Sequence, residues 1–142
     1  MCKFASFLHN PATGEVKVKV LDSHGDTEKQ LKLNPQVWRE GHYTPAGEIE
    51  LRITADDRVD KTEYETAFRN RFPSFISFLN WALLQCCDAD GKYRGWLDLN
   101  GLTSATGLKL PKTVGRWLDL KGLTSAEKAE IRKLRPDLRI YQ

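Results

Sequence analysis

The chain has 142 residues, of which 40% are hydrophobic and 29% charged, and its formal net charge is +3. This length suits one domain, or one domain with an appended module, and the composition is that of an ordinary globular protein. A charge of +3 is too small to indicate nucleic acid, which is therefore not the expected partner. No apolar run reaches about 18 residues, which argues against a membrane-spanning helix.

The start of the chain and its cysteines predict a cytoplasmic protein. Lys3 and His9 interrupt the apolar segment that a signal peptide needs. Cys2, Cys86 and Cys87 form no disulfide framework, because their number is odd and two of them are adjacent. The histidines and carboxylates show none of the spacings typical of metal sites, so neither a metal nor another cofactor is expected.

The first half of the chain predicts a β-hairpin, a short helix and a third strand. Residues 2–8 and 16–20 are the two hairpin strands, the second alternating between valine and lysine with period two. Thr27 with Gln30 forms a capping-box pattern, which predicts a helix start. Residues 48–53 alternate again between polar and apolar side chains and predict the third strand.

Two further helices are predicted before residue 90. Thr62 with Glu65 forms a second capping-box pattern, which opens a helix through about Asn70. A second helix is predicted over residues 74–85. Its apolar side chains cover most of its circumference, so we expect it to be the most buried element.

The clearest pattern in the chain is a stretch that occurs twice. Residues 96–105 recur 21 positions later as residues 117–126, with Asn100 against Lys121 as the one difference in ten. Residues 95–142 also contain 9 Lys/Arg and 5 Asp/Glu, so the positive excess of the protein lies here. A helix from Ser125 to about Leu134 and a strand over 138–141 are expected to follow.

Residues 107–126 read Gly-Leu-Lys-Leu-Pro-Lys-Thr-Val-Gly-Arg-Trp-Leu-Asp-Leu-Lys-Gly-Leu-Thr-Ser-Ala. This pattern resembles the short leucine-rich-like repeats of bacterial and bacteriophage open reading frames, with Arg116 where the repeats prefer glycine. The resemblance covers about residues 93–126, and it implies a scaffold or an interaction surface in a protein of phage or mobile-element type. Two copies are too few to bury their own faces, so we expect them to pack against the rest of the chain.

These elements predict an α+β fold in two parts. Residues 1–92 form a small antiparallel sheet with a buried helix, and residues 93–142 form a two-repeat leucine-rich-like module capped by the C-terminal helix. Trp96 and Trp117 occupy the same position in the two copies. We expect them to form a packing seam, and if they are exposed they become binding anchors.

A phosphate-binding site is predicted around the two His-Gly-containing loops. A helix that begins near Thr27 directs free N–H groups and the positive end of its dipole at an anion, and Trp38 or Tyr43 could stack on a base. His24 and His42 are alternatively surface or capping residues of polar loops. The predicted ligand-binding residues are Lys17, Lys19, Ser23, His24, Thr27, Arg39, His42, Tyr43 and Arg52.

The functional hypothesis is a non-enzymatic binding protein that recognises a phosphate-bearing, nucleotide-like small molecule or a host protein. Interference with host defence is one role for such a protein, and self-association into a homo-oligomer stays open. The alternative is a small hydrolase or transferase. It would use Cys2, which becomes N-terminal when Met1 is removed, or the pair His24 and His42.

Overall fold

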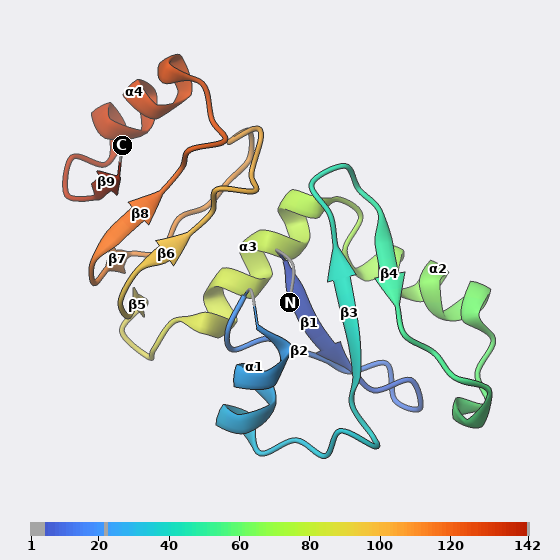
Figure 1. The fold of residues 1–142 in the computed structure, drawn as a ribbon. Helices are drawn as coiled ribbons and strands as arrows, with labels where there is room; N and C mark the ends of the chain where they lie inside the picture. The colour runs from blue at the N-terminus through green and yellow to red at the C-terminus, as the bar shows by residue number, and fades with distance from the viewer. Residues whose placement is uncertain (1–4, 22, 142) are drawn as a thin grey trace.

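A four-stranded antiparallel sheet in the order β2-β1-β3-β4 forms the first half of the protein in a computed structural model, which describes residues 5–21 and 23–141 (Figure 1). Its strands are β1 (Ser6–His9), β2 (Val16–Lys17), β3 (Arg39–Tyr43) and β4 (Ile49–Leu51). The predicted hairpin is confirmed, since Leu8 lies opposite Lys17 and His9 opposite Val16. Residues 2–4 of the predicted first strand lie outside the described residues.

β3 is a strand that the sequence did not predict. Its sequence Arg-Glu-Gly-His-Tyr lacks the alternation of apolar and polar residues typical of a half-buried strand. It nevertheless lies between β1 and β4, with Gly41 opposite both Phe7 and Leu51. The ring of Phe7 occupies the space that a Cβ at Gly41 would need, so the absence of a side chain lets the ring cross the strand.

The helices among the described residues are α1 (His24–Leu31), the 3-10 helix η1 (Ala55–Asp57), α2 (Lys61–Arg71), α3 (Phe75–Cys86) and α4 (Ser125–Leu134). The first three α-helices cover the two faces of the sheet. Neighbouring residues of a strand point to opposite faces. Tyr43 therefore packs on Phe68 of α2 and Phe78 of α3, with ring centroids 6.0 and 5.5 Å away. His42 contacts His24 of α1 on the other face.

Two predicted helix starts are wrong. The N-cap of α1 is Ser23, whose hydroxyl accepts a hydrogen bond from the backbone N–H of Asp26 at 3.2 Å, and Thr27 lies inside the helix. The N-cap of α2 is Asp60, and Thr62 lies inside that helix. In both cases a polar side chain before the predicted cap already satisfies the first free N–H groups, so the helix begins earlier.

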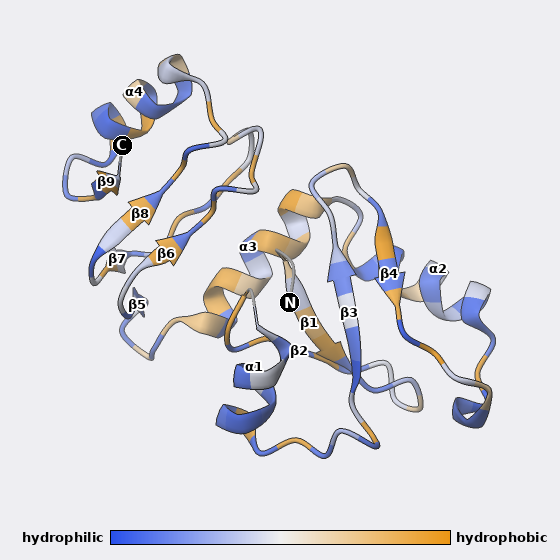
Figure 2. Ribbon diagram, in the orientation of Figure 1, coloured by the Kyte–Doolittle hydropathy of each residue, from blue (hydrophilic) through white to orange (hydrophobic). Residues whose placement is uncertain are grey.

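The predictions for α3 and α4 are confirmed. Ser74 caps α3 through a reciprocal pair of hydrogen bonds with Ser77, each between one side chain and the other backbone N–H. α3 lies between the sheet and the C-terminal strands, and it is the most hydrophobic helix of the chain (Figures 1 and 2). One of its apolar residues, Leu84, is 69% exposed, so the apolar surface does not surround the helix completely.

The C-terminal part consists of short parallel strands whose register equals the period of the repeated sequence. β5 (Lys92–Tyr93) pairs with β7 (Thr113–Val114), and β6 (Leu97–Asp98) pairs with β8 (Trp117–Asp119). Leu97 lies opposite Leu118, 21 residues later, so equivalent residues of the two copies stack on each other. The inward side chains are the almost fully buried Leu97, Leu99, Leu102, Leu118, Leu120 and Leu123.

A third layer continues this stack. α4 follows the second copy, and the predicted last strand is confirmed as β9 (Arg139–Tyr141), which pairs in parallel with β8. Ile140 lies opposite Leu118 and extends the inward row, giving the strand order β6-β8-β9. The buried residues of this part and of the antiparallel part belong to one hydrophobic core. The expectation that the repeated segment leans on the rest of the chain therefore agrees with the packing.

Candidate functional site

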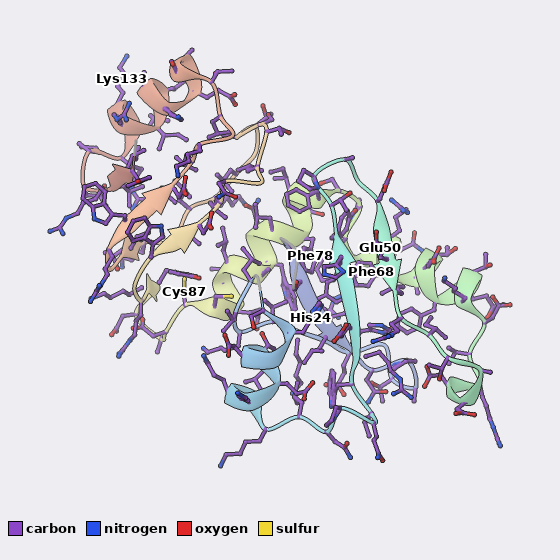
Figure 3. The ribbon with its side chains drawn as sticks, in the orientation of Figure 1. His24, Glu50, Phe68, Phe78, Cys87 and Lys133 are labelled. Atoms are coloured by element: carbon purple, nitrogen blue, oxygen red, sulfur yellow. The ribbon has the colours of Figure 1, made fainter. Side chains whose placement is uncertain are left out.

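The structure brings the two predicted histidines together. His24 is almost fully buried, and its Nε2 lies 3.0 Å from the carbonyl oxygen of Gly41 (Figure 3). The ring of His42 contacts the ring of His24 edge-on, with centroids 4.7 Å apart, and its Nδ1 lies 3.7 Å from the carboxylate of Glu50. The pair therefore joins the first turn of α1 to β3, which is a structural role.

Three other members of the predicted set also hold the fold together. Ser23 caps α1. Thr27 is 1% exposed, and its hydroxyl oxygen accepts hydrogen bonds from the N–H groups of Lys19 and Val20 at 3.1 and 2.8 Å. Tyr43 is fully buried and donates its hydroxyl to the carbonyl of Phe72 at 2.9 Å. The prediction that Tyr43 stacks on a ligand does not fit this burial.

Two of the predicted basic residues are engaged with carboxylates. Arg39 donates to Asp57 at 2.8 Å, and this hydrogen bond holds the pKa of the Asp57 carboxyl below its usual value. Arg52 lies 3.6 Å from Glu40. Both positive charges are therefore partly neutralised within the protein, which weakens their attraction for a phosphate.

The predicted lysines lie in a different place from the histidines. Lys17 lies over the ring of Trp38 at 5.3 Å, and Lys19 approaches the carbonyl of Gln85 at 3.5 Å. Both lysines line a hollow of about 410 Å³ beside Arg71. His42 and Arg52 line another hollow, of about 380 Å³, at the β3–β4 edge. The predicted set is thus divided between two hollows, the protein interior, the cap of α1 and the Arg39–Asp57 ion pair, and does not converge on one pocket.

The most exposed aromatic surface lies on the C-terminal strands. Trp96 is 46% exposed, Trp117 is 42% exposed and Tyr141 is 36% exposed. The Tyr141 ring lies 5.3 Å from Trp96 and 6.3 Å from Trp117, and Lys121 lies over it at 4.7 Å. We call Trp96, Trp117 and Tyr141 the aromatic face. The expectation of a packing seam at the two tryptophans does not fit this exposure, and their alternative role as exposed anchors does.

The sequence contains a signal for this face, although Tyr141 was not predicted as part of it. The leucines before and after Asp98 point into the core, so the period of two along a strand directs Trp96 and Asp98 outwards. The same alternation directs Trp117 outwards because Leu118 is buried. Tyr141 joins the two tryptophans only because β9 adds itself to the sheet, and sequence spacing does not show that pairing.

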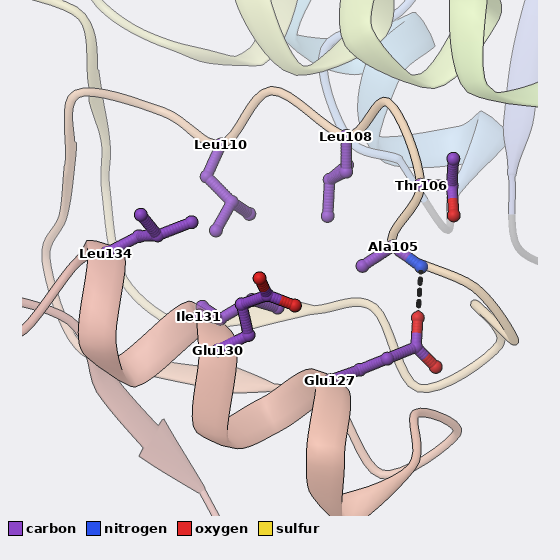
Figure 4. Close-up of a pocket in the computed structure, with 8 residues that line it drawn as sticks. All are labelled: Ala105, Thr106, Leu108, Leu110, Glu127, Glu130, Ile131 and Leu134. Carbon is purple, nitrogen blue, oxygen red and sulfur yellow. Dashed lines mark hydrogen bonds between the residues drawn. The ribbon is translucent and has the colours of Figure 1, made fainter.

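A second candidate is the groove between α4 and the extended segment that follows the first repeat copy (Figure 4). It has a volume of about 300 Å³, and the exposed side chain of Leu134 stands at one end. At the other end the Glu127 carboxylate accepts a hydrogen bond from the Ala105 N–H at 2.9 Å, which lowers the pKa of Glu127. This bond fixes α4 to the first repeat. The groove is lined by Ala105, Thr106, Leu108, Leu110, Glu127, Glu130, Ile131 and Leu134.

Several predictions concern features beyond these surfaces. Cys2, the nucleophile of the alternative hypothesis, lies outside the described residues. Within residues 5–21 and 23–141, no three side chains of His, Cys, Asp or Glu gather in a way that could hold a metal ion. None of the helices in this part of the chain has the length and apolar character needed to cross a membrane.

Comparison of the chain with protein-family models, with curated proteins and with solved structures finds no match. The fold and its surfaces define a mixed α/β protein with a small antiparallel sheet and an exposed aromatic face. The functional argument therefore rests on the geometry of that face.

Proposed function

We propose that the protein is a non-enzymatic binding protein and that the aromatic face is its contact surface. The proposed ligand is nucleotide-like, with a flat base and a phosphate. The observation that supports this proposal best is the exposure of Trp96 and Trp117 at equivalent positions of the repeat. Exposed tryptophan and tyrosine rings offer stacking surfaces to a base, and exposed arginines offer donors to a phosphate.

The architecture of the repeated segment also supports this proposal. Its resemblance to leucine-rich-like repeats of phage and bacterial reading frames implies an interaction surface. Stacked parallel strands hold outward side chains of successive copies in a row, which suits a binding face. We therefore propose a protein of phage or mobile-element type, for which interference with host defence is one role.

The second candidate partner is a host protein. Trp, Tyr and Arg are the residues most enriched in the energetic centres of protein–protein interfaces, and the aromatic face consists of the first two of these residue types. The hydrolase or transferase alternative has less support. It depends on Cys2, outside the described residues, and on His24 and His42, whose rings contact each other inside the fold.

Titration of 15N-labelled protein with AMP tests the proposal, because the four indole N–H signals report on four separate places. We expect the signals of Trp96 and Trp117 to shift, and those of Trp38 and Trp81 to stay. Inorganic phosphate alone should cause smaller shifts, because it cannot stack. Single Trp→Phe variants assign the signals.

The same titration distinguishes the alternatives. Shifts at Trp38 together with backbone signals of His42 would place the ligand at the antiparallel sheet and contradict the proposal. If AMP moves no indole signal, a single nucleotide is ruled out as the ligand and the host-protein candidate takes its place.

A further inference from the structure

The aromatic face consists of three half-exposed rings. Trp96 directly precedes β6, Trp117 lies on β8 and Tyr141 lies on β9. These three parallel strands are neighbours in one sheet. Neither the groove beside α4 nor the hollows of the antiparallel sheet include these rings. Sites for small molecules are usually concave and surround most of the ligand. Neighbouring half-exposed rings outside these hollows suit an extended ligand that presents one ring after another.

The polar side chains around the rings are mainly basic. Arg116 and Arg139 are exposed, and neither forms an ion pair with another described residue. Arg139 lies opposite Trp117 in the β8–β9 register, so this cation flanks the rings. Lys121 adds a third exposed cation over Tyr141, and its ammonium group lies 3.9 Å from the carboxylate of Asp119.

The carboxylates of the face offset this charge only in part. Asp119 is 5% exposed, and it accepts a hydrogen bond from the backbone N–H of Lys121 at 3.1 Å. Its equivalent in the first copy, Asp98, accepts one from Asn100 at 3.0 Å and is exposed. Lys121 is paired with Asp119. Among the described residues, Arg116 and Arg139 are therefore the unpaired cations of this surface and Asp98 is its exposed carboxylate, which leaves a small positive excess around the rings.

From these observations we infer that the aromatic face binds a short stretch of single-stranded nucleic acid. The bases stack on Trp96, Trp117 and Tyr141, while Arg116, Lys121 and Arg139 contact the phosphates. Stacking rings beside cations is the usual arrangement for single strands, because every base offers a flat face and the backbone is anionic. Binding is then tolerant of base sequence. The small net charge of the whole chain does not report this local excess. This inference rests on the proposed function, and it extends the ligand from one nucleotide to several.

Fluorescence anisotropy with labelled ten-nucleotide strands of dT and rU tests the inference. We expect both strands to bind at least tenfold more tightly than AMP, because several bases stack at once. A DNA duplex of the same length should bind more weakly than either strand, since its bases are already stacked. The logarithm of the association constant should fall with the logarithm of salt concentration with a slope of about −1.4 to −2.1, as two or three phosphate contacts predict.

Matched variants locate the site. Trp117→Ala should weaken strand binding about tenfold, whereas Trp38→Ala, at the partly exposed tryptophan beside Lys17, should leave it unchanged. Arg139→Gln should weaken binding and make the salt slope shallower by about 0.7, while Arg132→Gln on α4 should change neither. Circular dichroism of each variant checks that the fold is retained.

The outcomes separate this inference from the proposed function. Strands that bind no more tightly than AMP, while AMP still shifts the indole signals of Trp96 and Trp117, overturn the inference alone. Duplex that binds as well as single strands also overturns it, because attraction to phosphates would then suffice. If neither strands nor AMP affect these tryptophans, both the inference and the proposed function fail.

Discussion

Asn80 of α3 accepts a hydrogen bond from the backbone of Lys109, and together with a second hydrogen bond to Gly107 this contact joins the two parts of the protein. Its side-chain oxygen accepts a hydrogen bond from the N–H of Lys109 at 2.8 Å, and its side-chain nitrogen donates to the carbonyl of Gly107 at 2.9 Å. The amide thus matches one donor and one acceptor of an extended segment, as a neighbouring strand would. The segment between the two repeat copies is thereby fixed on the most buried helix.

Asn80→Ala is therefore expected to destabilise the protein by about 1–2 kcal/mol, since two backbone groups lose their partners. Chemical denaturation measures this free energy of unfolding. Asn70→Ala, at an exposed position of α2, is the matched control and should change stability by less than about 0.5 kcal/mol. Equal effects of the two substitutions would contradict the role assigned to Asn80.

Much of this fold could be predicted from the sequence because its local signals are strong. The apolar helix α3 and the doubled segment each carry a pattern that packing does not override. β3 could not be predicted, because its Gly41 and His42 are polar or small and become strand residues only through pairing with β1 on one side and β4 on the other. Such pairing is a tertiary effect that propensity does not contain.

Thr27 illustrates why the functional site could not be predicted from the sequence. The sequence places it at a helix start in a phosphate site, whereas the structure buries its hydroxyl against the backbone of Lys19 and Val20. Thr27→Val keeps the shape and removes the acceptor, so we expect it to lower the free energy of unfolding by about 1–3 kcal/mol. AMP binding at the aromatic face should be unchanged.

The control for Thr27 is Thr66→Val on the exposed surface of α2, where the hydroxyl donates a hydrogen bond to the carbonyl of Thr62 in the same helix. It should change stability by less than about 0.5 kcal/mol. Loss of AMP binding in a folded Thr27→Val protein, with stability intact, would restore the predicted phosphate site and remove the structural role.

The structure also explains why the repeated segment has a glycine at position 122, which the spacing of the two copies does not show. Gly122 of the second copy lies against the backbone of the first, where an added Cβ would stand 2.7 Å from the carbonyl oxygen of Asn100 and in contact with that of Leu102. The repeat therefore has glycine here because consecutive turns approach too closely for a side chain.

Gly122→Ala should force these turns apart and lower the free energy of unfolding by about 1–3 kcal/mol. Hydrogen exchange should show lost protection at the N–H of Leu99, which donates to Asp119 across the two turns. Gly25→Ala in α1 is the matched control, since open space surrounds that position. It should be neutral or stabilising by up to about 1 kcal/mol, because alanine favours the helix.

The prediction with the most specific pH signature concerns His9 on β1. Its ring is fully buried, with Nδ1 3.1 Å from the hydroxyl of Tyr64, and its Nε2 has no hydrogen-bond partner among the described residues. Burial lowers the pKa of His9 from 6.5 to about 4. Between these values the unfolded chain takes up a proton that the folded protein refuses, so stability falls as the pH is lowered through this window.

The difference between 6.5 and about 4 corresponds to about 3 kcal/mol, lost progressively between pH 6.5 and pH 4. Urea denaturation across this range should show that loss in the unmodified protein. His9→Phe removes the titrating group from the same buried space, so its stability should decline less over the window, by up to that amount. His42→Gln, at the other histidine of the sheet, should retain the contribution of His9. If His9→Phe and the unmodified protein lose stability in parallel, another group governs the acid response and the assigned pKa of His9 is wrong.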